Sequence, residues 1–187
     1  MPIRNPALYS SFRRLVAAAL LALSSPLAHA HITLQFPQAR PGLVVPNGYP
    51  CGYDPDPGRT TSLVLHPGAM VEVRWTEWID HPSHFRISFD ADGQDSFIDP
   101  AGYDDFYTNA TVLLDNIMDG SGVTEHTASI TLPNVQCNNC TLQVMQVLTG
   151  KPPYTSGPTS DDLHRVCADL RLDADLVFGD GFDGSHS

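Results

Sequence analysis

The chain has 187 residues, 42% hydrophobic and 17% charged, a composition that fits neither a disordered chain nor a collagen. It has 21 acidic against 10 basic side chains and a formal net charge of −11, which disfavours binding to a phosphate backbone or an anionic membrane surface. We therefore expect a globular, monomeric protein with neither nucleic acid nor membrane as partner.

Residues 1–30 have the pattern of a secretory signal peptide. Arginines precede the apolar run 15–23, and Ala-His-Ala at 28–30 offers a cleavage site between small residues. Cleavage after Ala30 would leave a chain that begins at His31 and is secreted or periplasmic. No later segment has the roughly eighteen consecutive apolar residues that a membrane span needs.

The rest of the chain has the pattern of an all-β protein. Its 16 prolines and 14 glycines separate short segments, several of which alternate apolar and polar residues as half-buried strands do. The expected strands are residues 62–65, 70–78, 84–89, 128–132, 141–148 and 167–172. The segment 99–116 has room for one or two helical turns and stays unassigned. Strands at this spacing predict an antiparallel β-sandwich with long loops.

This sandwich should occupy residues 31–172. Residues 173–187 alternate Asp and Gly around two phenylalanines and lack the ordered ligand pattern of a calcium loop. We expect them to form a flexible tail.

All four cysteines lie in the part that would be exported, where an even number predicts disulfides rather than a free thiol. Three pairings are open. We favour Cys137–Cys140, which encloses only two residues in a tight turn, and Cys51–Cys167, which would tie the start of the domain to its last strand. Zinc at the CxxC would need a second ligand pair at matching spacing.

Two histidine features indicate a metal. His31 would have a free α-amine beside its imidazole, so one residue would offer two nitrogens to an ion, which suits Cu(II) when a third nitrogen is added. His81-Pro82-Ser83-His84 stands between two expected strands, where an imidazole reaches the sheet edge. Alternation places His84 on a strand face and leaves His81 in the turn, so His81 is the preferred ligand and His84 its alternative.

Four pieces of the sequence together resemble a known protein family. In chain order they are the signal ending before His31, the segment HPSHFRISF, the segment CNNCTLQV and the terminal segment HRVCADLRL. The sequence resembles the copper-dependent lytic polysaccharide monooxygenases and their bacterial homologues, the histidine-brace proteins. This resemblance covers roughly residues 31–172. It implies an immunoglobulin-like or fibronectin-like sandwich with one copper ion at its edge.

Carried over position by position, the resemblance makes His31 and His81 the copper ligands and places Gln143 where the family often has a polar residue near the metal. His164 stands where the family usually has Tyr or Phe in the axial direction. It either offers a third imidazole or points away and leaves the axial position to water. The implied reaction is oxidative cleavage of an insoluble polysaccharide of the chitin or cellulose class by hydrogen peroxide or dioxygen, with an external electron donor.

Exposed aromatic faces are the usual docking groups for sugars. The candidates are Trp75, Trp78, Tyr103, Tyr107 and Tyr154. Two other functions remain open: a protein that stores or delivers copper without oxidising sugar, and a recognition sandwich without metal.

Overall fold

The computed structural model describes residues 32–42, 44–45, 48–59, 63–120, 122 and 124–176. The expectations for the signal peptide, for His31 and for residues 177–187 lie outside these residues. The strands are β1 (Ile32–Phe36), β2 (Leu63–Leu65), β3 (Met70–Glu77), β4 (Ser83–Asp90), β5 (Val112–Met118), β6 (Glu125–Thr131), β7 (Cys137–Leu148) and β8 (Leu163–Leu172). Among the described residues, no helix has the length and apolar character to span a membrane.

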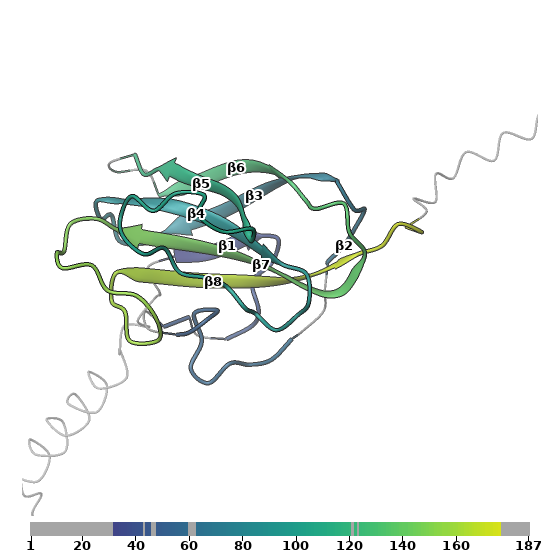
Figure 1. The fold of residues 1–187 in the computed structure, drawn as a ribbon, viewed down its shortest axis with the longest axis horizontal. Helices are drawn as coiled ribbons and strands as arrows, with labels where there is room; N and C mark the ends of the chain where they lie inside the picture. The colour runs from purple at the N-terminus through teal and green to yellow at the C-terminus, as the bar shows by residue number, and fades with distance from the viewer. Residues whose placement is uncertain are drawn as a thin grey trace, which may run out of the picture.

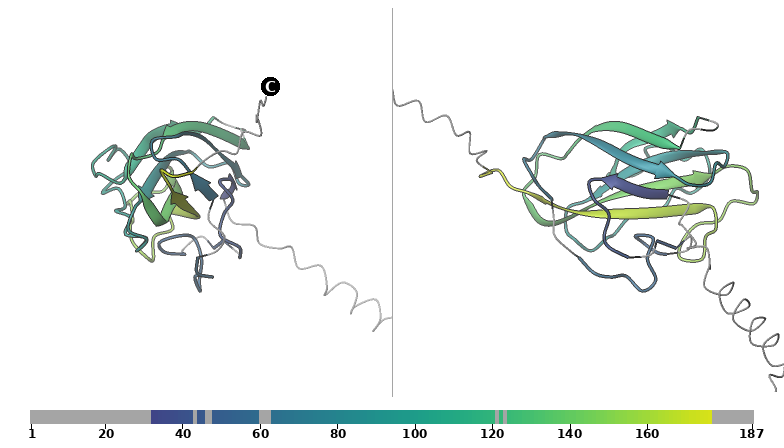
Figure 2. Two further views of the ribbon diagram at one scale, coloured as in Figure 1. Left: turned by 90° about the vertical axis from the view of Figure 1, so that its right-hand side faces the viewer. Right: turned by 180° about the vertical axis from the view of Figure 1, so that it is seen from behind.

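The strands form two packed sheets, which confirms the all-β sandwich (Figure 1). The smaller sheet has the order β1-β3-β6 and the larger one the order β2-β8-β7-β4-β5. Seen from behind, β1 runs beside β3 and also approaches β8 of the other sheet (Figure 2). The two sheets therefore meet along this edge.

The core between the sheets follows the predicted alternation. Phe85, Ile87 and Phe89 of β4 share the inward face and are at most 5% exposed. Trp75 of β3 is fully buried against Phe85, with the ring centroids 5.2 Å apart. The buried apolar side chains supply the main stabilisation of such a sandwich, because stability scales with the apolar area removed from water.

Three details differ from the prediction. Strand β1 was not predicted, although Ile32, Leu34 and Phe36 alternate visibly in the sequence. The segment 99–116, left unassigned from the sequence, has turns and bends that lead into β5, a strand that was not predicted. Strand β2 pairs with β8 in parallel, so the larger sheet is mixed.

The outer face of the larger sheet has buried polar side chains beside two small apolar clusters, and long loops cover it. Arg86 of β4 is fully buried there and pairs with Asp115 at 2.7 Å. Arg165 of β8 pairs in the same way with Asp99, also at 2.7 Å. The Arg165–Asp99 pair thus fixes a covering loop by a short, charge-assisted contact, whereas the Arg86–Asp115 pair links β4 to its neighbour β5.

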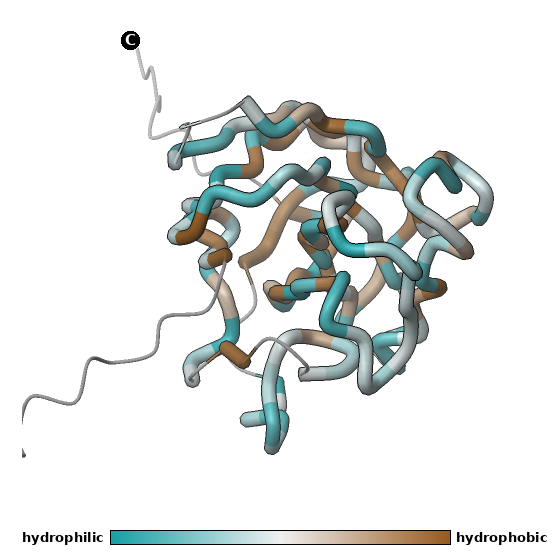
Figure 3. Tube along the Cα trace, turned by 90° about the vertical axis from the view of Figure 1, so that its left-hand side faces the viewer, coloured by the Kyte–Doolittle hydropathy of each residue, from teal (hydrophilic) through white to brown (hydrophobic). Residues whose placement is uncertain are grey.

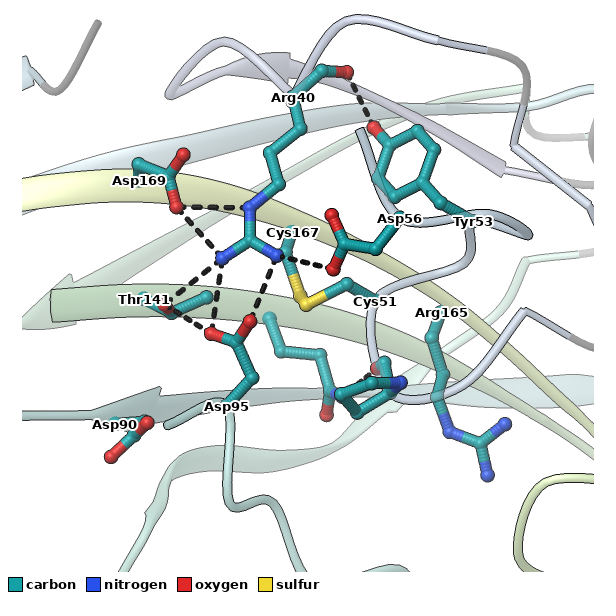
Figure 4. The surroundings of a disulfide bond; sticks show 12 residues. Arg40, Cys51, Tyr53, Asp56, Asp90, Asp95, Thr141, Arg165, Cys167 and Asp169 are labelled. Carbon is teal, nitrogen blue, oxygen red and sulfur yellow. Dashed lines mark hydrogen bonds and ion pairs between the residues drawn. A yellow bond between two sulfur atoms is a disulfide. The ribbon is translucent and has the colours of Figure 1, made fainter. Parts of the chain in front are cut away.

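The structure contains the disulfides Cys51–Cys167 and Cys137–Cys140, and no cysteine is free. Beside the first one, Arg40 joins the loop after β1 to the sheet (Figure 4). Its guanidinium contacts Asp169 at 2.8 Å and Asp95 at 2.8 Å. The Arg40 side chain is 1% exposed, so these contacts are shielded from solvent.

The arginines also set the acid sensitivity of this region. Burial opposes ionisation of Asp95, but hydrogen bonds from Arg40 and Thr141, together with the charges of Arg40 and Arg59, outweigh it and hold the pKa of Asp95 below its ordinary 3.8. A carboxylate with a depressed folded pKa adds stability that is present above its unfolded pKa and lost as the pH falls through the folded pKa.

We therefore expect the free energy of unfolding to decline as the pH falls below the ordinary 3.8 of Asp95, and Asp95→Asn to remove part of that slope. Urea unfolding of both proteins over a series of acidic pH values measures this. If the free energy of unfolding depends on pH in the same way in both proteins, Asp95 does not contribute to the acid sensitivity.

Candidate metal centre

One end of the sandwich collects the start of β1, the end of β3, the start of β4, the end of β7 and the start of β8 (Figure 3, viewed onto this end). The register fixes this arrangement: Ile32 pairs with Glu77, and Ser83 pairs with Leu148. Residues far apart in the sequence therefore meet here.

A cavity of about 440 Å³ lies at this end. It is lined by His81, Pro82, Leu148, Gly150, Lys151, Asp161 and His164. Two of the histidines singled out from the sequence therefore face one space, and the exposed ion pair of Lys151 and Asp161 stands at its rim.

His81 lies in the β3–β4 loop and is half-buried. Its backbone N–H donates to Glu77 Oε1 at 3.3 Å, which ties the loop to the end of β3. The next carbonyl, that of Pro82, accepts the backbone N–H of Thr149 at 2.8 Å. The loop that presents His81 is thus held from two sides.

His164 is the second residue of β8 and is 4% exposed. By alternation it shares the inward face of β8 with Val166 and Ala168, which belong to the core. Across the sheet it pairs in register with Gln146 of β7. The imidazole therefore lies where the apolar core ends and the cavity begins.

His84 does not join this pair. It lies on the outer face of β4, is 5% exposed and packs edge-on against Phe106 at 5.1 Å. Burial is the main cause that lowers the pKa of His84 below its ordinary 6.5, which favours the neutral ring. This placement agrees with the alternation along 84–89, which predicts His84 on a strand face and leaves His81 in the loop.

Gln143 also lies away from the cavity. Its Nε2 donates to the carbonyl of Pro50 at 2.8 Å, on the outer face of β7, and Gln143 pairs in register with Cys167. Gln146, three residues later, points inward and donates to Glu77 Oε1 at 2.6 Å. The alternation Leu142, Val144, Gln146 was the signal that could have selected the inward glutamine.

Glu77 is a second residue that sequence reasoning missed. It is 1% exposed, and its Oε1 accepts both from Gln146 and from the backbone of His81. Burial, followed by the nearby charge of Asp119, raises the pKa of Glu77 to about 7. Glu77 therefore connects β3, the His81 loop and the strand beside His164.

His31 lies outside the described residues. The residue that follows it, Ile32, is fully buried and pairs with Glu77. Glu77 in turn contacts the backbone of His81. The first described residue of the domain is therefore anchored at the end of the sandwich where His81 and His164 line the cavity.

The candidate docking aromatics divide into buried and exposed ones. Trp75 belongs to the core, and Tyr103 and Tyr154 pack against each other edge to face at 5.1 Å. Trp78 is 51% exposed and Tyr107 is 56% exposed. Trp78 follows β3 at the cavity end, and its Nε1 donates to Thr33 Oγ1 at 2.8 Å.

No family model matches the chain, and no curated protein matches it. Among solved structures it is similar to an AA15 lytic polysaccharide monooxygenase from Thermobia domestica in the Cu(I) state, with a TM-score of 0.43 and 20% sequence identity. The match covers 59% of this chain and 62% of that chain, less than two thirds of the neighbour's length. The similarity is distant.

Proposed function

We propose that this chain is an exported copper protein in which His31, His81 and His164 hold one copper ion, and that it oxidatively cleaves a polysaccharide. The observation that carries the proposal is the joint lining of one cavity by His81 and His164. The residue after His31 is anchored at the same end of the sandwich.

The side chains present fit copper. Two imidazoles line the cavity, and after cleavage behind Ala30 the first residue would add an amine and a third ring. Thiolates are excluded as ligands because all four cysteines are in disulfides. A set of nitrogen donors without thiolate suits Cu(II).

The surrounding residues would position these donors. Glu77 holds the His81 loop through the backbone N–H, and Gln146 fixes the carboxylate of Glu77 at 2.6 Å. Such outer contacts typically change metal affinity or activity by about 10–100-fold when they are removed. Bound copper would supply the one-electron redox chemistry that lets peroxide or dioxygen attack a C–H bond beside a glycosidic bond.

Trp78 would offer the sugar-binding face. Half of its surface is exposed, and the bond from its Nε1 to Thr33 fixes the indole beside the start of β1. An aromatic ring with an exposed apolar face and a bound polar atom is well suited to stack on a sugar. An insoluble chitin-type or cellulose-type chain is the proposed substrate, and an external donor would supply electrons.

The test is a Cu(II) titration with electron paramagnetic resonance on protein processed to begin at His31. A protein with one extra residue before His31, which converts the amine to an amide, should bind Cu(II) at least about tenfold more weakly. Its nitrogen hyperfine pattern should also change. Equal affinity and equal spectra in both proteins would remove His31 from the site.

A second candidate function is copper binding without sugar oxidation, and the position of His164 favours it. An additional imidazole in the cavity stabilises Cu(II) and disfavours its reduction. Peroxide-dependent release of oxidised oligosaccharides from chitin or cellulose separates the two functions. Tight copper binding without release of oligosaccharides would establish copper binding without sugar oxidation. If no tight copper binding is found, a recognition sandwich without metal is the remaining hypothesis.

A further inference from the structure

A group of three buried side chains lies behind the cavity. Glu77 ends β3, Asp119 follows β5, and His126 is the second residue of β6. One ligand atom from each lies within 4.8 Å of the others. Their side chains are 0%, 3% and 6% exposed, respectively, so the group is shielded from bulk water.

One oxygen of each carboxylate accepts a hydrogen bond from a neighbouring side chain, and the other oxygen faces the group of three side chains. Gln146 binds Glu77 Oε1 at 2.6 Å, and Ser83 Oγ binds Asp119 Oδ2 at 3.0 Å. The remaining oxygens, Glu77 Oε2 and Asp119 Oδ1, are buried, and no donor among the described residues hydrogen-bonds to either of them. Leaving such an oxygen unsatisfied is costly, and a neighbouring contact that orients a carboxylate is typical of metal ligands.

The imidazole of His126 completes the group. Its Nε2 lies 3.4 Å from Glu77 Oε2 and 4.0 Å from Asp119 Oδ1. Two ligands of a tetrahedral ion with bonds near 2.1 Å are separated by about 3.4 Å, so the first pair already has the required spacing.

The ring of His126 is also held in place. It stacks on Trp75 with an interplanar angle of 10° and a centroid distance of 5.4 Å. Phe85 packs on it at 4.6 Å. Two core aromatics thus orient the imidazole toward the carboxylates, as a ligand must be oriented before an ion binds.

We propose that Glu77, Asp119 and His126 form a second metal site, which takes a divalent cation of the zinc type. Two carboxylates balance the charge of such an ion in a shielded position. Imidazole together with carboxylate is a donor set that zinc accepts, whereas calcium takes six to eight oxygens. A water or the second oxygen of one carboxylate supplies the fourth ligand.

This site is distinct from the proposed copper ligands. The contact of Glu77 with the His81 loop runs through the backbone N–H of His81, and His81 lines the cavity. Loss of one metal should therefore leave the other bound. The two proposals can fail independently.

The experiment measures zinc and copper in the full exported chain by elemental mass spectrometry. The protein is first loaded with one equivalent of Cu(II), then dialysed against Zn²⁺ and finally against metal-free buffer. We expect one zinc per chain in the wild type and an at least about tenfold loss of zinc in Asp119→Asn, with the copper content unchanged. His81→Ala should show the reverse pattern.

The matched control is Glu125→Gln. Glu125 precedes His126 on β6, is exposed, and accepts a hydrogen bond from Thr76 at 2.9 Å, so its removal should leave zinc unchanged. Absence of zinc from the wild type, or equal zinc in Asp119→Asn, would overturn the proposal. So would loss of zinc together with copper in His81→Ala.

Where Asp119→Asn does not fold, crystals of the zinc-loaded wild type decide. Anomalous diffraction at the zinc edge should give a peak between Glu77, Asp119 and His126. A map without a peak there would overturn the proposal.

Discussion

Replacing His81 by alanine is expected to weaken Cu(II) binding by more than about 100-fold, the upper end of the effect of disturbing groups outside the ligand shell. His81 lines the cavity, and a loop tied to Glu77 and Thr149 presents it. Removing the ring deletes one nitrogen donor and leaves that loop in place. Titration with Cu(II) under competition from a chelator measures the change.

The control for this substitution is His66→Ala. His66 is exposed and lies before β3, at the other end of that strand, with its Nδ1 2.8 Å from the carbonyl of Pro67. Copper affinity should be the same as in the wild type. If His81→Ala also retains the wild-type affinity, the cavity is not the copper site.

The second large effect concerns stability. Arg40→Met should lower the free energy of unfolding by about 3 kcal/mol, the lower end of the range for breaking a buried ion pair. Asp169 is 2% exposed and would lose its principal partner, while Arg59 retains a 3.0 Å contact to it and limits the loss. Denaturant unfolding at neutral pH measures the difference.

Arg74→Gln is the matched control. Arg74 and Glu72 are 4.0 Å apart with side chains 57% and 61% exposed, and exposed pairs of this kind contribute about 0–1 kcal/mol. Equal stabilities for Arg40→Met and Arg74→Gln would show that the contacts around Arg40 add no more than a surface pair.

The sequence was sufficient to predict the strands that have one apolar face and one polar face. Phe85, Ile87 and Phe89 alternate with polar residues, and the structure buries all three in the core. Strand β5 begins with three consecutive aliphatic residues and pairs with β4 through irregular register, so no alternation marked it. A period-two pattern can therefore predict a strand such as β4, but gives no signal for a strand such as β5 that lacks the alternation.

In the candidate site, too, the sequence could indicate some residues and not others. His81 and His164 could be selected as residues because their type and position in the chain were informative, and one cavity brings them together. The group of Glu77, Asp119 and His126 could not be selected, because its members come from β3, the end of β5 and β6. Only the three-dimensional pairing of strands brings them near one another.

The cavity is lined by His81 from the loop that connects β3 of one sheet to β4 of the other, and by His164 from the last strand, which the disulfide Cys51–Cys167 ties to the first third of the chain. A chain that has not yet added β8 to the sheet has only part of this site. The full ligand set of the proposed copper site would therefore come together only after β8 has joined the sheet. A fragment cut before β8 would lack His164 and would offer only part of that ligand set.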